Sequence, residues 1–291
     1  MFGLGKKDRK GKTMENEILQ KKMVFASKLP EKVMLQSSPD GIECDLCGGN
    51  GYIIADEDGY EVAVPCKCIE KRQLQSRLRF ADLPESLKDV RLNTFSFDIY
   101  QSPEARNTIA TACIFIKQYL MDFEEEKKKG MGLYLYSARK GSGKTRMAAS
   151  IANELIYNHG IGVKFATSIA ILDAIKGSWD SKEYTERELL DSLFMVPVLV
   201  IDDFGTERTT DFANDRFYQI INQRYINTKV TVFTSNMSLS NIKYDERITN
   251  RIKERTYAID FPEESVREWI AESNHQEMRR KIFGKKRIRR D

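Results

Sequence analysis

Short apolar runs alternate with amphipathic stretches over most of this chain beyond residue 100. Runs rich in Val, Ile, Leu, Tyr and Phe predict strands, whereas apolar positions three and four apart predict helices. We expect strands at 131–136, 162–167, 197–201, 229–235 and 256–260. We expect helices at 103–129, 144–158, 168–176, 185–194 and 211–226. This alternation predicts an α/β fold, a parallel sheet that helices flank on both faces.

The N-terminal third of the chain follows a different pattern. Residues 14–37 predict one helix, or two short helices divided near Pro30, and glycines and cysteines gather between 41 and 70. Pro84 interrupts the helical pattern that follows. We therefore predict five regions: a basic tail with a helical segment (1–40), a cysteine-rich domain (41–70), a connector (71–102), an α/β core (103–262) and a short C-terminal helix with a basic tail (263–291).

Composition limits the class of protein. Of the 291 residues, 41% are apolar and 31% charged, which suits one main domain with smaller flanks. No apolar run approaches the ~20 residues of a membrane-spanning helix, and the N-terminus lacks the apolar core of a secretory signal, so we expect a cytoplasmic protein without a membrane partner. The net charge is +4, and basic residues crowd 6–12 and 279–290. Such tails indicate either a polyanion within reach or solvated ends.

A glycine-rich loop, SARKGSGKT, joins the strand at 131–136 to the helix at 144–158. Gly141 and Gly143 let the backbone approach an anion at the N-terminus of a helix. Lys144 can reach the outer phosphates of ATP, and the Thr145 hydroxyl can bind Mg²⁺. Ala138 replaces the first glycine of the G-x-x-x-x-G-K-[ST] pattern, a change that is mild if the local φ is negative and damaging if it is positive. The loop predicts an ATP site, and a chance glycine-rich turn is the alternative.

Polar groups follow two of the predicted strands. Asp202 and Asp203 end the strand at 197–201, and Asn236 ends the strand at 229–235. Open α/β sheets bind ligands at this edge, where Asp202 could hold Mg²⁺ and Asp203 could act as general base toward the attacking water. Asn236 could reach the γ-phosphate or that water. Acids that cap the following helix, and an ordinary asparagine in a turn, are the alternatives.

Three arginines could contact nucleotide. Arg247 and Arg251 are four residues apart and therefore share a helix face. An arginine supplied to a neighbouring subunit's ATP stabilises the charge of the transferring phosphoryl group. Salt-bridged surface arginines are the alternative. Arg267 could reach the nucleotide within its own chain.

Four of the five cysteines form two close pairs, Cys44 with Cys47 and Cys66 with Cys68. Two such pairs on hairpin-like loops can surround one tetrahedral Zn²⁺ and leave no coordination position for catalysis. The spacing therefore predicts a structural zinc site, with redox-active thiols as the alternative. Cys113 lies among apolar residues of a predicted helix and is expected in the core.

Together these motifs resemble the AAA+ ATPases of the DnaC/DnaI type, which load the replicative DNA helicase in bacteria and phages. The resemblance covers residues 41–270 and rests on the cysteine knuckle followed by GYI, and on LYLYS, GSGKT, LVIDDFG, FTSN and DERITNRI. It implies an AAA+ P-loop ATPase core with a parallel sheet flanked by helices, preceded by a small zinc-binding domain. The cofactors it implies are ATP, Mg²⁺ and Zn²⁺. The partners it implies are the replicative hexameric helicase, single-stranded DNA and further copies of the chain.

The resemblance also assigns roles to residues. It implies that nucleotide is bound by Gly141, Ser142, Gly143, Lys144, Thr145, Arg146, Asp202 and Arg267. It implies that the catalytic groups are Asp203, Asn236 as first sensor, and Arg251, with Arg247 second, as arginine finger. The Asp-Asp pair, where many AAA+ proteins carry Asp-Glu, predicts slow turnover, which we expect DNA to stimulate.

Two rival functions share these motifs. The transposition helper ATPases of the IstB type have the same core and act with a transposase on duplex DNA, but cysteine knuckles before the core favour the loader. A non-hydrolysing adaptor, or a decoy that blocks a helicase, is a rival from another class. The intact Lys144, Thr145, Asp202 and Asp203 argue against an inactive site.

Overall fold

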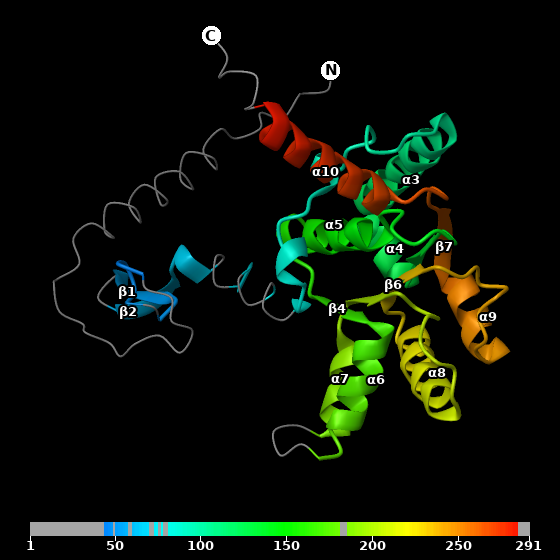
Figure 1. Cartoon of the computed structure of the whole chain (residues 1–291). Coiled ribbons are helices and arrows are strands. Elements are labelled where there is room, and N and C mark those ends of the chain that lie inside the picture. The colour runs from blue at the N-terminus through cyan, green and yellow to red at the C-terminus, as the bar shows by residue number, and fades with distance from the viewer. Residues whose placement is uncertain are drawn as a thin grey trace, which may run out of the picture. The chain divides into compact units, whose positions relative to one another are not determined.

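A computed structural model of the chain describes residues 44–48, 50–57, 60–69, 73–74, 77, 81–180 and 185–284 (Figure 1). The helix expected at 14–37, the N-terminal tail and the end of the C-terminal tail from 285 lie outside these residues. The chain divides into two compact units, Met1–Gln75 and Ser76–Asp291.

The first unit contains an antiparallel hairpin of β1 (Tyr52–Glu57) and β2 (Tyr60–Pro65). Pairing of Tyr52 with Pro65 brings the two ends of the hairpin together, and the Cys66 N–H donates to the Gly51 carbonyl at 2.8 Å. The cysteines that precede β1 therefore meet those that follow β2.

The second unit is built on a five-stranded sheet whose strand pairs are all parallel. Its strands, in spatial order, are β4 (Val163–Thr167), β5 (Val198–Asp202), β6 (Val230–Ser235), β3 (Gly132–Tyr136) and β7 (Thr256–Asp260). The predicted parallel sheet is confirmed, and each of the five strands begins and ends within one residue of its expected position. Since the strands are parallel, their carboxyl ends meet at one edge, where β6 lies between β5 and β3.

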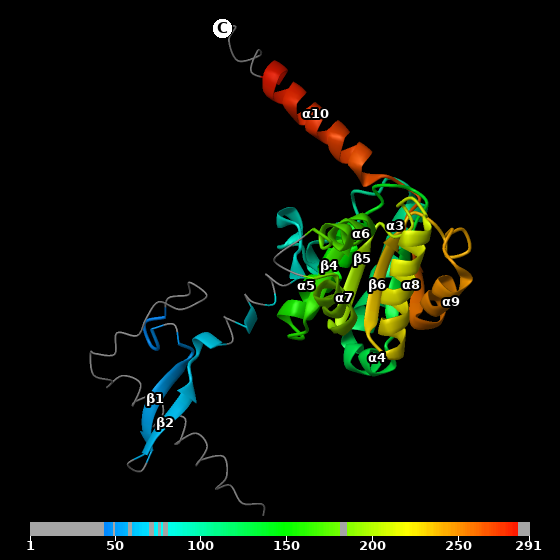
Figure 2. The same cartoon turned by 90° about the horizontal axis from the view of Figure 1, so that it is seen from below.

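Helices cover both faces of this sheet (Figure 2). They are α3 (Pro103–Met121), α4 (Phe123–Lys129), α5 (Lys144–Tyr157), α6 (Ser168–Gly177), α7 (Glu186–Met195), α8 (Asp211–Ile226) and α9 (Glu246–Arg255). The last helix, α10 (Val266–Gly284), projects away from the sheet and is exposed after Val266. Two short 3₁₀ helices, Glu85–Leu87 and Leu92–Thr94, precede them. Leu199 and Ile201 of β5 pack in one cluster with apolar residues of α6 to α9, whereas Val198 and Val200, which alternate with them, are buried on the opposite face.

The helix expected at 103–129 is in fact two helices. The backbone at Asp122 leaves the helical region with ψ near 12°, and its carboxylate accepts a hydrogen bond from the Gln118 amide at 2.6 Å. Aspartate favours such helix ends because its short polar side chain competes for hydrogen bonds with the backbone. The break lets Phe123 become fully buried, in an edge-on contact with Tyr119, while Met121 stays exposed.

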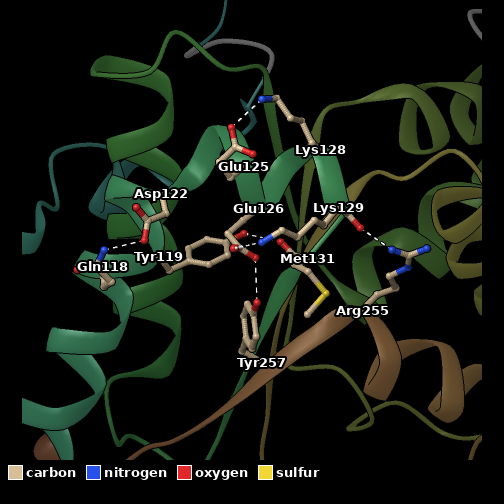
Figure 3. A network of polar contacts seen from close by, with 10 residues as sticks. All are labelled: Gln118, Tyr119, Asp122, Glu125, Glu126, Lys128, Lys129, Met131, Arg255 and Tyr257. Carbon is tan, nitrogen blue, oxygen red and sulfur yellow. Dashed lines mark hydrogen bonds and ion pairs between the residues drawn. The ribbon is translucent and has the colours of Figure 1, made fainter.

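Helix α4 anchors the edge strand β7 through a network of polar contacts (Figure 3). Glu126 pairs with Lys129 at 2.9 Å and accepts a hydrogen bond from the Tyr257 hydroxyl of β7 at 3.0 Å. Arg255, at the end of α9, donates to the Lys129 carbonyl. The start of β7 and the end of α9 are therefore fixed to the same helix.

Candidate nucleotide-binding site

The phosphate loop runs from the end of β3 to the start of α5. Gly141 and Gly143 both have positive φ, 80° and 98°, which side-chain-bearing residues rarely adopt. A Cβ atom would also collide with neighbours at either position. It would lie 2.8 Å from the Ser265 hydroxyl at Gly141, and 2.8 Å from the Tyr100 hydroxyl at Gly143. The positive φ therefore favours glycine at both positions, and a larger residue would also have to displace a neighbouring side chain.

Ala138 causes no strain in the loop. Among the residues that the structure describes, the non-glycine residues with positive φ are Asp82, Asp203 and Thr228. Ala138 is not one of them, and its side chain is exposed. The loss of the first glycine is therefore the mild change expected for a negative φ.

Lys144 is folded into the loop. Its ammonium group donates to the carbonyls of Ser137 and Arg139, both at 3.1 Å, and to the Ser142 hydroxyl at 3.2 Å. Burial lowers the pKa of Lys144, and nearby acids, Asp203 foremost, oppose this effect. A phosphate group would offer this buried cation the anionic partner that the neutral oxygens do not.

Asp202, the last residue of β5, and Asp203, which follows it, have different surroundings. Burial raises the pKa of Asp202, while hydrogen bonds from the Thr234 and Thr145 hydroxyls oppose the rise. The Asp202 carboxylate and the Thr145 hydroxyl are therefore neighbours, and oxygen ligands of this kind suit Mg²⁺. Asp203 is less buried, and its backbone is in the left-handed region with φ of 53°.

One pocket of about 540 Å³ brings most of the predicted residues together. It is lined by Ser86, Leu87, Lys140, Gly141, Ser142, Gly143, Lys144, Thr145, Arg146, Asp203, Thr206, Asn236, Val266 and Arg267. Asp202 lies beside this pocket through its contact with Thr145. The Arg267 side chain packs on Gly141, since a Cβ atom there would lie 3.2 Å from its Cγ.

Part of this lining was not predicted from the sequence. Ser86 and Leu87 belong to the connector, which the Asn153 side chain of α5 holds by donating to the carbonyls of Leu87 and Val90 at 2.9 and 2.8 Å. Nothing in the connector's sequence indicates this contact. Thr206, four residues after Asp202, could have been found by considering the loop that leaves β5 at the binding edge.

The two candidate finger arginines lie on α9 and do not line this pocket. Arg247 forms two bonds to the Asp245 carboxylate, at 3.0 and 2.9 Å. Arg251 donates to the Arg247 carbonyl at 2.9 Å, and within the described part of the chain no carboxylate pairs with it. Both guanidinium groups lie over the Tyr218 ring, at 4.6 and 5.3 Å from its centroid. A carboxylate therefore already pairs with Arg247, whereas the described residues offer Arg251 only a backbone carbonyl and aromatic rings.

The four paired cysteines of the first unit form one cluster. Their sulfur atoms all lie within 4.8 Å of one another, with Cys44 to Cys66 at 3.7 Å and Cys47 to Cys68 at 3.4 Å. A tetrahedral shell with Zn–S bonds of about 2.3 Å spaces its sulfurs by roughly 3.8 Å, so the cluster fits Zn²⁺. Burial opposes ionisation of Cys47, but hydrogen bonds, led by the Gly51 N–H at 3.3 Å, lower its pKa to about 6. Cys113 is buried in α3, as expected.

None of the helices in the described residues combines the length and the apolar character that crossing a membrane requires.

A protein-family model described as "IstB-like ATP binding protein" matches residues 66–258 of the chain. The phage-like element PBSX protein XkdC of Bacillus subtilis (strain 168) is 24% identical over 225 residues, which cover 75% of this chain and 81% of that protein. The replicative helicase loader DnaC of Escherichia coli (strain K12) is 27% identical over 139 residues, 47% of this chain and 55% of that protein. The chain thus spans little more than half of the loader's length.

Solved structures agree in fold. The crystal structure of the DnaC helicase loader has a TM-score of 0.51 and 24% identity, covering 62% of this chain and 100% of that one. The crystal structure of DnaI has a TM-score of 0.51 and 28% identity, covering 62% and 95%. These similarities show the AAA+ fold for the second unit.

Proposed function

The chain belongs to the family of IstB-like ATP binding proteins, AAA+ ATPases related to the DnaC/DnaI helicase loaders, and from this membership we propose that it hydrolyses ATP to load a replicative DNA helicase onto single-stranded DNA. The observation that carries the proposal is the pocket, which unites a phosphate loop, an acid and a neutral polar residue from three neighbouring strands. This set offers groups that can bind the phosphates, accept the proton of the attacking water and align that water.

In the proposed mechanism, Lys144 and the loop amides neutralise the phosphates. Thr145 and Asp202 would hold Mg²⁺, which would neutralise part of the phosphate charge. Asp203 accepts the proton of the attacking water as general base, and Asn236 aligns that water from the strand between β3 and β5. Arg267 contacts the nucleotide within its own chain.

The last group comes from a second copy of the chain. Arg251 lies outside its own pocket and has no carboxylate partner among the described residues. We assign it to the ATP of a neighbouring subunit, where it stabilises charge on the transferring phosphoryl group. Arg247 is the second choice because Asp245 already holds it. Hydrolysis would then depend on self-association.

The first unit is proposed to bind the helicase. Its cysteine cluster would hold a structural Zn²⁺ through Cys44, Cys47, Cys66 and Cys68. Two facts support this division of labour: the first unit is compact by itself, and most of it lies before the matched family region. Nucleotide state in the ATPase unit would control assembly on DNA while the first unit retains the helicase.

The test is ATP hydrolysis by the purified protein, alone and with single-stranded or duplex DNA, with a candidate hexameric helicase added in a parallel series. Lys144→Ala is the control for contaminating ATPases. Stimulation by single-stranded DNA together with a stable helicase complex supports the loader.

The family description favours one rival function. Because the matching model is named for IstB-like proteins, a transposition helper is the second candidate. Turnover that responds only to duplex DNA, without a helicase complex, would support it. Absence of turnover under every condition would leave a non-hydrolysing adaptor or decoy.

A further inference from the structure

The parallel pairing of β3 with β7 continues beyond the ends of both strands. Tyr136 and Asp260 form the last residue pair of the two strands. The Phe261 N–H then donates to the Tyr136 carbonyl at 2.6 Å, and the Ser137 hydroxyl donates to the Pro262 carbonyl at 2.9 Å. The segment that leads from β7 to α10 therefore runs alongside the phosphate loop in the register that the strands establish.

The next residue of this segment, Glu263, accepts two backbone hydrogen bonds from the start of the loop. One carboxylate oxygen accepts the Ala138 N–H at 2.8 Å, and the other accepts the Arg139 N–H at 2.9 Å. Hydrogen bonds to an ionised carboxylate are stronger than those between neutral groups, and two together fix orientation as well as distance. The loop thus begins on a fixed anion.

Glu263 holds a part of the loop that ligand would leave free. The pocket is lined by residues 140–146, and neither Ala138 nor Arg139 belongs to its lining. Further along, the Val266 N–H donates to the Gly141 carbonyl at 3.0 Å. The loop is therefore tied to the same segment before and inside the phosphate-binding stretch, while the amides beyond Gly141 remain available.

The neighbouring glutamate makes a similar contact elsewhere. Glu264 accepts the N–H groups of Gln101 and Ser102, the latter at 3.0 Å, at the start of α3. The two adjacent carboxylates thus bind two pairs of backbone amides, one pair in the phosphate loop and one pair at a helix start. They form a natural pair for comparison.

We propose that Glu263 is a positioning residue for nucleotide binding, which holds the start of the phosphate loop in its ligand-binding conformation. The proposal rests on the proposed ATP-binding function. A loop held in its bound conformation loses less entropy when it binds, so its affinity is higher. In this chain the loop begins with Ala138 and Arg139, and the carboxylate supplies the constraint from another segment.

The test is titration of a fluorescent ATP analogue into the full-length wild type, Glu263→Ala, Glu263→Gln and Glu264→Ala. Glu263→Ala should weaken binding by roughly three- to tenfold, since two charge-assisted bonds at an exposed site are lost. The affinity of Glu263→Gln should lie between those of the wild type and Glu263→Ala, because the glutamine amide keeps one acceptor oxygen. Glu264→Ala should change affinity by less than about twofold, because its amides lie outside the loop. Steady-state kinetics should show a higher KM for ATP in Glu263→Ala with kcat retained.

Equal affinity in the wild type and Glu263→Ala would overturn the proposal, and so would an equal loss in Glu263→Ala and Glu264→Ala, which would indicate general loosening. Thermal unfolding without nucleotide verifies that each variant is folded. If Glu263→Ala does not fold, the analogue affinity of Glu263→Gln is compared with those of the wild type and Glu264→Ala instead. Failure of the ATP-binding function itself is distinguishable, because the wild type and Lys144→Ala would then bind equally poorly.

Discussion

Thr234 accepts the backbone N–H of Asp203 at 2.9 Å, reaching from β6 to the residue that follows β5. The same hydroxyl donates to the Asp202 carboxylate at 2.6 Å. One side chain of β6, the strand that Asn236 follows, therefore contacts both acids. The two acids are thus held together at the binding edge of the sheet by a residue two positions before Asn236.

Replacing Asp203 with asparagine should separate chemistry from binding. The neutral amide introduced by Asp203→Asn cannot accept the proton of water, so kcat should fall by about 100-fold or more. Asparagine tolerates the left-handed backbone observed here, so the loop should keep its shape and nucleotide affinity should change little. Single-turnover hydrolysis and analogue binding measure the two effects, and a kcat close to the wild type would refute the assignment of the general base.

Arg251→Ala should suppress turnover by about 100-fold or more while leaving nucleotide binding nearly unchanged, because the residue is proposed to act on a neighbouring subunit's ATP. Arg247→Ala is the matched control on the same helix face. It should have the smaller effect, since Asp245 occupies the Arg247 guanidinium. An equal loss of nucleotide binding and turnover in Arg251→Ala would refute its assignment as the arginine finger.

Removal of zinc should unfold the first unit without affecting the second. The four sulfurs are the cluster that holds the hairpin ends together, and the ATPase fold has its own core. A strong chelator, or Cys44→Ser, should expose residues 44–69 to proteolysis while the thermal transition of the ATPase unit stays in place. Zinc content is measured on the same samples, and a purified wild type without bound zinc would contradict this prediction. Cys113→Ser, outside the cluster, is the control for zinc content.

Among the basic residues of α8, Arg224 is predicted to contribute most to the free energy of unfolding. Its guanidinium is buried and donates to the carbonyls of Leu193 and Val196 at 2.6 and 2.9 Å, and also to that of Val230. Arg224→Ala would leave these buried acceptors unsatisfied, so the free energy of unfolding should fall by about 3 kcal/mol or more. Denaturant unfolding measures the change.

The control for that experiment lies on the same helix. Arg216 forms a partly exposed ion pair with Glu186 at 3.0 Å, so Arg216→Ala should lower the free energy of unfolding by only about 1 kcal/mol or less. Similar losses in Arg216→Ala and Arg224→Ala would show that the buried carbonyls find other partners.

The sequence predicted those features whose cause is local. The strand that ends at Tyr136, the glycines at 141 and 143 and the helix from Lys144 follow from apolar pattern and backbone freedom within a short stretch. Asp122 was missed as a helix boundary because the apolar periodicity runs through it. The helix breaks at Asp122 where the chain buries Phe123, and this burial depends on tertiary packing.

The unpredicted parts of the candidate site depend on strand order. Glu263 lies more than a hundred positions from Ala138 in the sequence, and only the pairing of β3 with β7 brings them together. The same holds for Ser86, which reaches the pocket because Asn153 fixes the connector on α5. Pattern within one segment carries no information on such neighbours.

The left-handed backbone at Asp203 also limits how this site can evolve. Aspartate, asparagine and glycine enter that region most readily, whereas glutamate is less suited to it. The longer acid found at this position in many AAA+ proteins would therefore arrive with a conformational penalty, and the loop around it would have to change as well. With Asp203 as the proposed general base, a lineage that carries this loop is therefore expected to keep the shorter acid at this position.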